Sequence, residues 1–207
     1  MRFLLLLVLF PLRVLAWGAA GHEIVATIAQ IHLHPDAYPT ICSILGNPVS
    51  TTNGPPCLLA TVATWADRMR FKMHWSAPLH YVGALGDYPP HTCLFPGDRG
   101  WDGSQDANVL SATRNVSNIL TSYVRNVKLG ASISAHDTER ANEALKFLIH
   151  FIGDLHQPLH LTGRDRGGNG DKVMFDGRHT SMSTHPLSFP SRADRPFQIS
   201  TRYGTRS

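Results

Sequence analysis

Cysteine is scarce in this 207-residue sequence, which contains three. So few thiols exclude a fold held together by several disulfides and a structural zinc site built from four thiolates. The sequence shows no internal repeat, which excludes solenoid and propeller architectures. After residue 16, no apolar run approaches the roughly 18 residues that a membrane-spanning helix requires. These absences favour a single domain with a substantial hydrophobic core.

A strong charge of one sign is also lacking in the body of the chain. The formal net charge is +4, but Arg2 and Arg13 contribute +2, and the four Arg and one Asp after Thr180 contribute +3. Residues 17–180 therefore carry a net charge of −1. A nearly neutral body does not attract nucleic acid over long distances, so binding of a polyanion would depend on a bound metal and a few local Arg residues.

The first 16 residues have the pattern of a secretory signal peptide. Arg2 is followed by a run of Leu, Val and Phe and then by Val14-Leu15-Ala16, a small-residue cleavage signature. The segment is too short to span a membrane. The mature chain is therefore expected to be secreted and to begin at Trp17.

Two further features agree with secretion. The sequon Asn115-Val116-Ser117 predicts N-glycosylation of Asn115. Three cysteines in an oxidising compartment predict one disulfide and one leftover thiol. We expect Cys42 to pair with Cys57, because these two close a short loop that is rich in Pro, Gly and Asn. Cys93 is then unpaired.

The densest group of candidate metal ligands is FLIHFIGDLHQPLH, residues 147–160. Seven of the nine residues in 144–152 are apolar, which predicts a helix that is buried nearly all round. His150 and Asp154 are four residues apart and share one face of it. A buried, unpaired carboxylate costs on the order of several kcal/mol, and a divalent metal would remove that cost. His160 follows where the chain can return a third ligand. The alternative is a His–Asp hydrogen bond in an ordinary core.

The expected mature N-terminus, WGAAGH, offers a second set of ligands. The free amine and the carbonyl oxygen of Trp17 can chelate a metal, and His22 lies about one helical turn further on. A helix is expected to continue to Ile31. The alternative is that Trp17 fills a hydrophobic pocket while His22 caps that helix.

Two further segments carry polar side chains among apolar ones. In WADRMR, Asp67 and Arg70 share a helix face, either as a metal ligand beside an Arg that binds a phosphate oxygen, or as a surface ion pair worth under ~1 kcal/mol. In WSAPLHY, an inward-facing His80 is either a ligand or a core histidine. Tyr81 is either a platform on which a base stacks or a buried aromatic.

The remaining pattern predicts helices at 58–73, 106–127 and 137–155, loops at 34–56 and 83–104, and a short strand or extended segment at 172–176. The loop 164–170, which contains Asn169, is rich in glycine, so its backbone can approach a ligand closely. Residues 181–207 contain scattered Pro, Ser and Arg without hydrophobic periodicity, which predicts a disordered tail.

The four motifs WGAAGH, WADRMR, WSAPLHY and FLIHFIGDLHQPLH stand in the order and at roughly the distances found in fungal S1/P1-type zinc-dependent nucleases. The sequence resembles that family from residue 17 to about 180. The resemblance implies an all-α, mostly helical domain of the zinc nuclease and zinc phospholipase C type, with three zinc ions in a cleft. It also implies a monomer that hydrolyses single-stranded DNA and RNA to 5′-nucleotides and acts on 3′-nucleotides.

The resemblance further implies a role for each matching residue. The first zinc is expected on Asp67, His80, His150 and Asp154, the second on Trp17, His22 and the bridging Asp154, and the third on His160. Asp67 would orient or deprotonate the attacking water and Arg70 would hold the phosphoryl oxygens. Tyr81 would stack on a base, and Asn169 is a further expected substrate contact.

The sequence departs from the family pattern at two places. Gly83 stands where the family usually has a polar side chain that reads the base edge. After residues 175–180 the expected N-L-H-x-x-W-D motif does not follow, so the last His and Asp ligands fall at Ser183 and Leu187. A frame change, retained intron or alternative splice near Thr180 is one hypothesis, and it would also explain the missing partner of Cys93.

Three functions are therefore weighed from the sequence. The first is a secreted zinc nuclease, impaired by loss of the last ligand motif and holding at most two zinc ions. The second is a hydrolase of the zinc phospholipase C type, which shares the terminal Trp and the H-x-x-x-D arrangement. The third is a non-catalytic remnant that binds zinc or nucleic acid.

Overall fold

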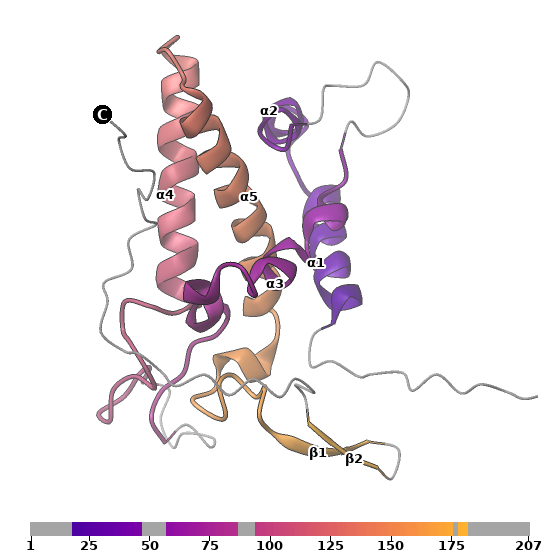
Figure 1. The fold of residues 1–207 in the computed structure, drawn as a ribbon, viewed down its shortest axis with the longest axis vertical. Helices are drawn as coiled ribbons and strands as arrows, with labels where there is room; N and C mark the ends of the chain where they lie inside the picture. Colours follow the sequence, from indigo (N-terminus) through magenta and orange to yellow (C-terminus); the bar gives the residue numbers. More distant parts are fainter. Residues whose placement is uncertain (1–17, 47–56, 87–93, 176–177, 182–207) are drawn as a thin grey trace, which may run out of the picture.

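The computed structural model describes residues 18–46, 57–86, 94–175 and 178–181. The predicted signal peptide, Trp17, Cys93 and the segment from residue 182 onward, predicted to be a disordered tail, lie outside the described residues. The fold is mostly helical, as predicted (Figure 1). Its helices are α1 (Ala19–Ile31), α2 (Ala37–Ile44), α3 (Trp65–Met69), α4 (Val109–Lys128) and α5 (Ala135–Leu155), with the 3₁₀ helices η1 (Leu59–Val62), η2 (His74–His80) and η3 (Pro158–Leu161).

Two long antiparallel helices, α4 and α5, form the frame of the molecule (Figure 1). Each begins at a capping box, in which the side chains of the cap residue and the third helical residue bond to each other's backbone N–H groups. In α4 these residues are Asn108 and Ser111, and in α5 they are Ser134 and Asp137. The caps satisfy backbone donors that would otherwise have no partner inside the helix, so both start points are set by local sequence.

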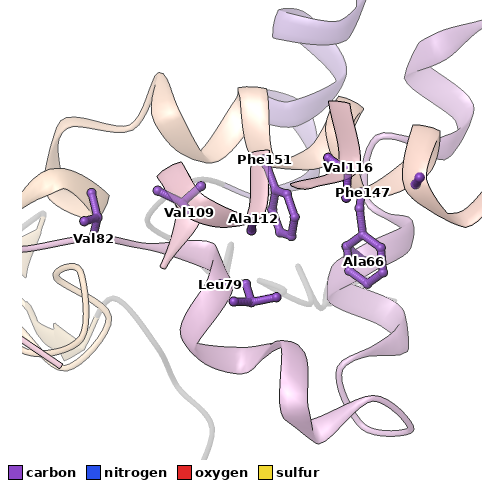
Figure 2. Close-up of a cluster of buried hydrophobic side chains, with 9 residues drawn as sticks. Ala66, Leu79, Val82, Val109, Ala112, Val116, Phe147 and Phe151 are labelled. Carbon is purple, nitrogen blue, oxygen red and sulfur yellow. The ribbon is translucent and has the colours of Figure 1, made fainter. Parts of the chain in front are cut away.

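The main hydrophobic core lies where α3 and η2 cross the lower ends of α4 and α5 (Figure 2). The rings of Phe147 and Phe151, one turn apart on α5, stack with centroids 5.3 Å apart. The edge of Trp65 meets Phe147 at 5.2 Å. Leu79 is buried in the same core. Because His150 stands between these two phenylalanines in sequence, the core also fixes the part of α5 that carries the ligand candidates.

The opposite side of α5 is covered by α1 and η1 (Figure 1). Ala26 of α1 packs with Leu59 and Ala63 in a second buried cluster. The predicted disulfide between Cys42 and Cys57 is present, and it ties α2 to the segment that leads into η1. These contacts fix α1 against α5 and so bring the N-terminal part of the chain to the ligand-bearing helix.

The described chain ends in a small hairpin, in which β1 (Lys172–Phe175) pairs antiparallel with β2 (Arg178–Ser181). Its register pairs Lys172 with Ser181 and Phe175 with Arg178. The short strand or extended segment expected at 172–176 is therefore observed as a strand, together with a partner strand that the sequence did not indicate. None of the helices described is long and apolar enough to cross a membrane.

Two predictions about local structure were wrong. The segment 34–56, predicted as a loop, contains α2, where Pro39 sits in the first helical turn, a position that does not need its missing N–H. Ile41 and Ile44 give this helix an inner face. The single helix predicted for 58–73 is instead η1 followed by α3, because Thr64 between them has a non-helical backbone with φ −99° and ψ 8°.

Candidate metal centre

Six of the seven predicted protein ligands converge on one point of the fold, and the seventh, Trp17, lies outside the described residues. Helix α5 supplies the central pair, since His150 and Asp154 lie one turn apart and are 0% and 2% exposed. The others come from four different elements: His22 from α1, Asp67 from α3, His80 from η2 and His160 from η3. Between Ala141 and Leu155 no residue of α5 is exposed, which confirms the prediction of a helix buried nearly all round.

Three of these side chains form a triangle of ligand atoms. His80 Nδ1 lies 3.0 Å from Asp154 Oδ2 and 3.0 Å from His150 Nε2, and the third side, His150 Nε2 to Asp154 Oδ2, is 3.3 Å. In a tetrahedral zinc site with metal–ligand distances of about 2.0–2.1 Å, neighbouring ligand atoms stand roughly 3.3 Å apart. The triangle therefore has the size of one face of such a site.

The other carboxylate oxygen of Asp154 faces two more histidines. His22 Nε2 lies 3.4 Å from Asp154 Oδ1, and His160 Nε2 lies 3.8 Å from the same oxygen. Asp67 Oδ1 approaches His150 Nε2 at 3.7 Å from the open side. Asp154 thus presents one oxygen to each of two groups of nitrogens, which is the arrangement that a carboxylate bridging two metal ions requires.

Backbone carbonyls fix the protonation of two of the histidines. His150 Nδ1 donates to the carbonyl oxygen of Ala63, and His160 Nδ1 donates to that of Gly167, each at 2.7 Å. With the proton on Nδ1, Nε2 is in each ring the nitrogen that faces Asp154 and can offer a lone pair to a metal. Such second contacts are typical of metal-binding histidines, because they orient the ring and select its tautomer.

The carbonyl that holds His160 belongs to an unusual turn. Asp165, Arg166, Gly167 and Gly168 all have positive φ, from 42° to 77°. The turn is closed by a hydrogen bond from the Gly168 N–H to the Arg164 carbonyl at 2.7 Å. A Cβ on Gly167 would lie 2.5 Å from that of Tyr81. Glycine is therefore needed at 167 both for its conformation and for the close approach of Tyr81.

Burial dominates the electrostatics of the cluster. It lowers the pKa of His22 to about 3 and also lowers the pKa values of His80 and His150. In contrast, burial raises the pKa of Asp154 to about 7. Neutral imidazoles are ready to bind a metal, whereas a buried carboxylate without a cation tends to keep its proton. The cluster is therefore electrostatically incomplete without a positive charge at its centre.

Asp67 differs from Asp154 in being accessible. Its side chain is 42% exposed. Burial pushes its pKa upward, but the charges of His150 first and of Arg70 among others push it further down, so the net pKa is lowered. Asp67 is therefore an ionised carboxylate at neutral pH that reaches from solvent to the buried histidines, a suitable position for a group that contacts both metal and substrate.

The predicted substrate contacts Arg70, Tyr81 and Asn169 each follow or adjoin an element that carries a ligand candidate. Arg70 follows α3, and its guanidinium lies over the ring of Phe71 at 5.1 Å. Tyr81 follows His80 directly and is half-buried, and burial raises its pKa. Asn169 donates from its side-chain amide to the carbonyl oxygen of Arg166 at 2.8 Å, so this amide helps to hold the turn that supports His160.

Sequence reasoning missed three residues that shape the centre. Ala63 and Gly167 act through backbone carbonyls, for which a sequence carries no signal. Gly153 lies inside α5 and in contact with the ring of His22. A glycine between two ligands of an otherwise apolar helix was a visible signal for such a close approach.

A buried cluster of histidines and carboxylates without thiolate, open on one side and carried by a helical frame, is characteristic of catalytic rather than structural metal sites. The chain belongs to the S1/P1 nuclease family, whose sequence model matches residues 17–187.

Three relatives illustrate the similarity. Nuclease P1 of Penicillium citrinum is 36% identical over 170 residues, which is 80% of this chain and 55% of that protein. Nuclease S1 of Aspergillus oryzae is 38% identical over 168 residues, 80% of this chain and 51% of that protein. Endonuclease 2 of Arabidopsis thaliana is 34% identical over 170 residues, 80% of this chain and 53% of that protein. The chain thus spans about half the length of these relatives.

Proposed function

We propose that this protein is a secreted zinc-dependent nuclease that hydrolyses phosphodiester bonds of single-stranded DNA and RNA to 5′-nucleotides and also acts as a 3′-nucleotidase. The observation that carries the proposal is the cluster around Asp154, in which one buried carboxylate faces two sets of histidine nitrogens. Membership of the S1/P1 nuclease family supports the same activity.

The residues present fit zinc. Since His150 Nε2 carries a lone pair, one proton on His80 Nδ1 cannot satisfy all three contacts of the triangle, whereas a cation inside it would. Asp67, His80, His150 and Asp154 would hold the first ion, and His22, Trp17 and Asp154 the second. His160 would contribute to a third site, whose further family ligands align with Ser183 and Leu187, so we propose at most two bound ions. Bound zinc would polarise a phosphoryl oxygen and lower the pKa of a coordinated water.

The protein's own part in the reaction falls to Asp67 and Arg70. Asp67 is ionised and solvent-accessible, so it can accept a proton from the attacking water and orient its lone pair toward phosphorus. Arg70 lies three residues further on and bears a guanidinium that can donate two hydrogen bonds to phosphoryl oxygens. Together they place the nucleophile and the phosphate in one orientation at the rim of the buried cluster.

Selection of single strands follows from the position of Tyr81. Its half-buried ring adjoins His80 and the turn that holds His160, so a base stacked on it would bring the adjoining phosphate toward the cluster. A base in a duplex must first be unpaired and unstacked, which costs about a few kcal/mol. Single-stranded substrates avoid that cost. Asn169 would act indirectly by holding this turn.

The test is to express residues 17–207 so that Trp17 is the first residue and to measure zinc per chain together with hydrolysis of single-stranded DNA, double-stranded DNA and phosphatidylcholine. We expect bound zinc and release of 5′-nucleotides from the single strand. Asp67→Asn should bind the first zinc ion more weakly and, when assayed at saturating zinc, should still lose about 10²–10⁴-fold in rate, as is typical of losing a general base. Release of phosphocholine without nucleotides would instead establish a phospholipase, and zinc binding without either product would establish a non-catalytic protein.

A second measurement tests the role of the N-terminus. Chelation by Trp17 requires a free amine, so a chain that keeps Ala16 should bind the second zinc ion more weakly than one that starts at Trp17. Zinc titrations of both chains give the comparison. Equal stoichiometry and affinity would show that the terminal amine is not a ligand. Mass spectrometry of the secreted protein would test cleavage before Trp17 and glycosylation of Asn115, which lies half-buried in α4.

A further inference from the structure

The ring of His22 lies in a narrow slot on the surface of α5. On one side it stacks on the ring of His150, with centroids 4.0 Å apart and planes inclined by 10°. At its Nδ1 edge it touches the backbone at Gly153: a Cβ placed there would lie 2.3 Å from His22 Nδ1, 3.0 Å from Cε1 and 3.2 Å from Cγ. All three atoms belong to the imidazole ring, so an added methyl group would meet its flat face or edge. The ring and a side chain at 153 cannot occupy the same space.

His22 is held differently from His150 and His160. His150 and His160 each donate from Nδ1 to a backbone carbonyl, which fixes the orientation of the ring. In the described part of the chain, His22 Nδ1 has no hydrogen-bond partner, although the atom is buried. Its other nitrogen, Nε2, is the one that faces Asp154 Oδ1 at 3.4 Å. The direction of His22 toward Asp154 is therefore set by the shape of the slot.

The backbone does not explain why residue 153 is glycine. Gly153 lies inside α5 and is not among the glycines with positive φ, so any residue could adopt its conformation. Glycine is also one of the least favourable residues within a helix, and alanine the most favourable. Local helix stability thus favours alanine at 153, and only the space taken by the His22 ring opposes it.

We propose that Gly153 is a positioning residue of the metal centre, whose missing side chain forms the slot that aims His22 at Asp154. The inference rests on the proposed zinc function only for the identity of the metal. The slot is also the contact through which the first helix of the described chain reaches the ligands of α5. Gly153 therefore determines whether α1 contributes a nitrogen to the centre.

A double-mutant cycle tests the slot without relying on catalysis. Four chains that start at Trp17 are compared by denaturant unfolding after removal of metal: the unsubstituted protein, Gly153→Ala, His22→Ala and the double variant. We expect Gly153→Ala to lower the unfolding midpoint when His22 is present. In the His22→Ala background the same substitution should leave the midpoint unchanged or raise it, because the clash is gone and alanine favours the helix.

Zinc titration supplies the second readout. Gly153→Ala should lose one of the bound zinc ions or bind it about 10–100-fold more weakly, as is typical when the groups that orient a ligand are disturbed. The first ion should be affected much less, because Asp67 and His80 come from other elements and the ring of His150 is held independently by the carbonyl of Ala63. These results do not require nuclease activity, so a failure of the proposed reaction and a failure of the slot can be told apart.

Two results would overturn the inference. One is a Gly153→Ala protein that binds every zinc ion as tightly as the unsubstituted protein. The other is a loss of stability from Gly153→Ala that is equally large without the His22 ring, which would mean that residue 153 serves general helix packing. If Gly153→Ala does not fold, the double variant decides: recovery of folding supports the slot, and failure of both variants contradicts it.

Discussion

The two long helices of this protein, α4 and α5, are similar in length and in how they begin, but they differ in how far they are buried and in whether they carry candidate ligands. Helix α4 has 20 residues and α5 has 21, and both begin at capping boxes. Yet α4 buries only Val109, Ala112 and Val116, all in its first half, whereas α5 is shielded along its whole second half and carries His150 and Asp154 there. Helix formation is thus a local property that both share. Suitability for a metal centre comes from being covered on several sides, which only α5 achieves.

The substitution expected to have the largest effect on the difference between α5 and α4 is Asp154→Asn, which keeps the shape of the side chain and removes its charge. We expect zinc affinity to fall by at least about 100-fold, because the amide cannot bridge two sets of histidines as the carboxylate does. Stability with zinc present should fall by about 2.3 kcal/mol for a 100-fold loss of affinity, and by about 2.7 kcal/mol if binding is lost, when zinc is supplied at 100 times the original Kd. Calorimetry and zinc analysis check both.

The matched control for that experiment is Glu139→Gln, which changes the same kind of charge at an exposed position of the same helix. It should leave zinc content and melting temperature almost unchanged. Full zinc occupancy and an unaltered melting temperature in Asp154→Asn would make Asp154 an ordinary core residue. They would also remove the main support for the metal centre.

Substitutions in the main hydrophobic core, to which both helices contribute, should have the next largest effect on stability. Phe151→Ala should destabilise the protein by about 3–5 kcal/mol and Val116→Ala by about 2 kcal/mol, since both side chains are almost fully buried. Only Phe151→Ala should also weaken zinc binding, because the ring of Phe151 supports that of His80 edge to face at 5.6 Å. Unfolding curves and zinc titrations of the two variants give the comparison. Equal zinc affinities would mean that α5 and α4 support the centre equally.

The pH dependence of zinc binding gives a smaller effect. Burial raises the pKa of Asp154 to about 7 and lowers that of His22 to about 3. Below pH 7, zinc must therefore displace a proton from Asp154, while His22 is already neutral. Zinc affinity should fall about tenfold for each pH unit between roughly 7 and 5, with release of about one proton. Titrations in buffers of different ionisation enthalpy measure this. Affinity that is constant over the range, or release of several protons near pH 6.5, would contradict it.

The helix caps should give the smallest effects, and unequal ones. Ser134→Ala at the exposed start of α5 should cost about 1 kcal/mol, as caps usually do. Asn108→Ala at the start of α4 should cost about 2 kcal/mol, because this buried side chain also donates to the carbonyls of Ser104 and Gln105. Chemical denaturation of the two variants tests the order. A larger loss from Ser134→Ala would mean that burial of the cap does not matter.

The helices that could be predicted from the sequence are those that a local pattern of residues encodes. Features that depend on packing between distant segments could not be predicted. The periodicity of apolar residues correctly predicted α1, α4 and α5, because a helix that is buried on one or more faces shows that pattern locally. Helix α2 was missed, since Pro39 and its small polar neighbours resemble a loop, and its inner face becomes evident only once α5 packs against it. The break at Thr64 between η1 and α3 likewise results from packing that no local pattern encodes.

For the candidate site, the residue types and their spacing predicted which side chains could meet. His150 and Asp154 are fixed relative to each other by the helix alone. The approach of His22, Asp67, His80 and His160 to that pair came from the resemblance to a family, and the structure brings all four to it. The carbonyls of Ala63 and Gly167 could not be predicted, because they are atoms that every residue has. The glycine at 153 was visible in the sequence as a signal of a close approach, but the ring of His22 that makes this approach was not.

The distribution of the ligands along the chain also has a consequence for the order of folding. The α4–α5 pair is built from nearby segments and can form early, but by itself it presents only His150 and Asp154. His22, at the far end of the sequence, and His160, beyond α5, join them only when α1 and η3 have docked. A metal ion would therefore find no complete site on a partly folded chain and would bind only after these segments have met. Uptake of the metal would then serve as a natural reporter that folding has finished.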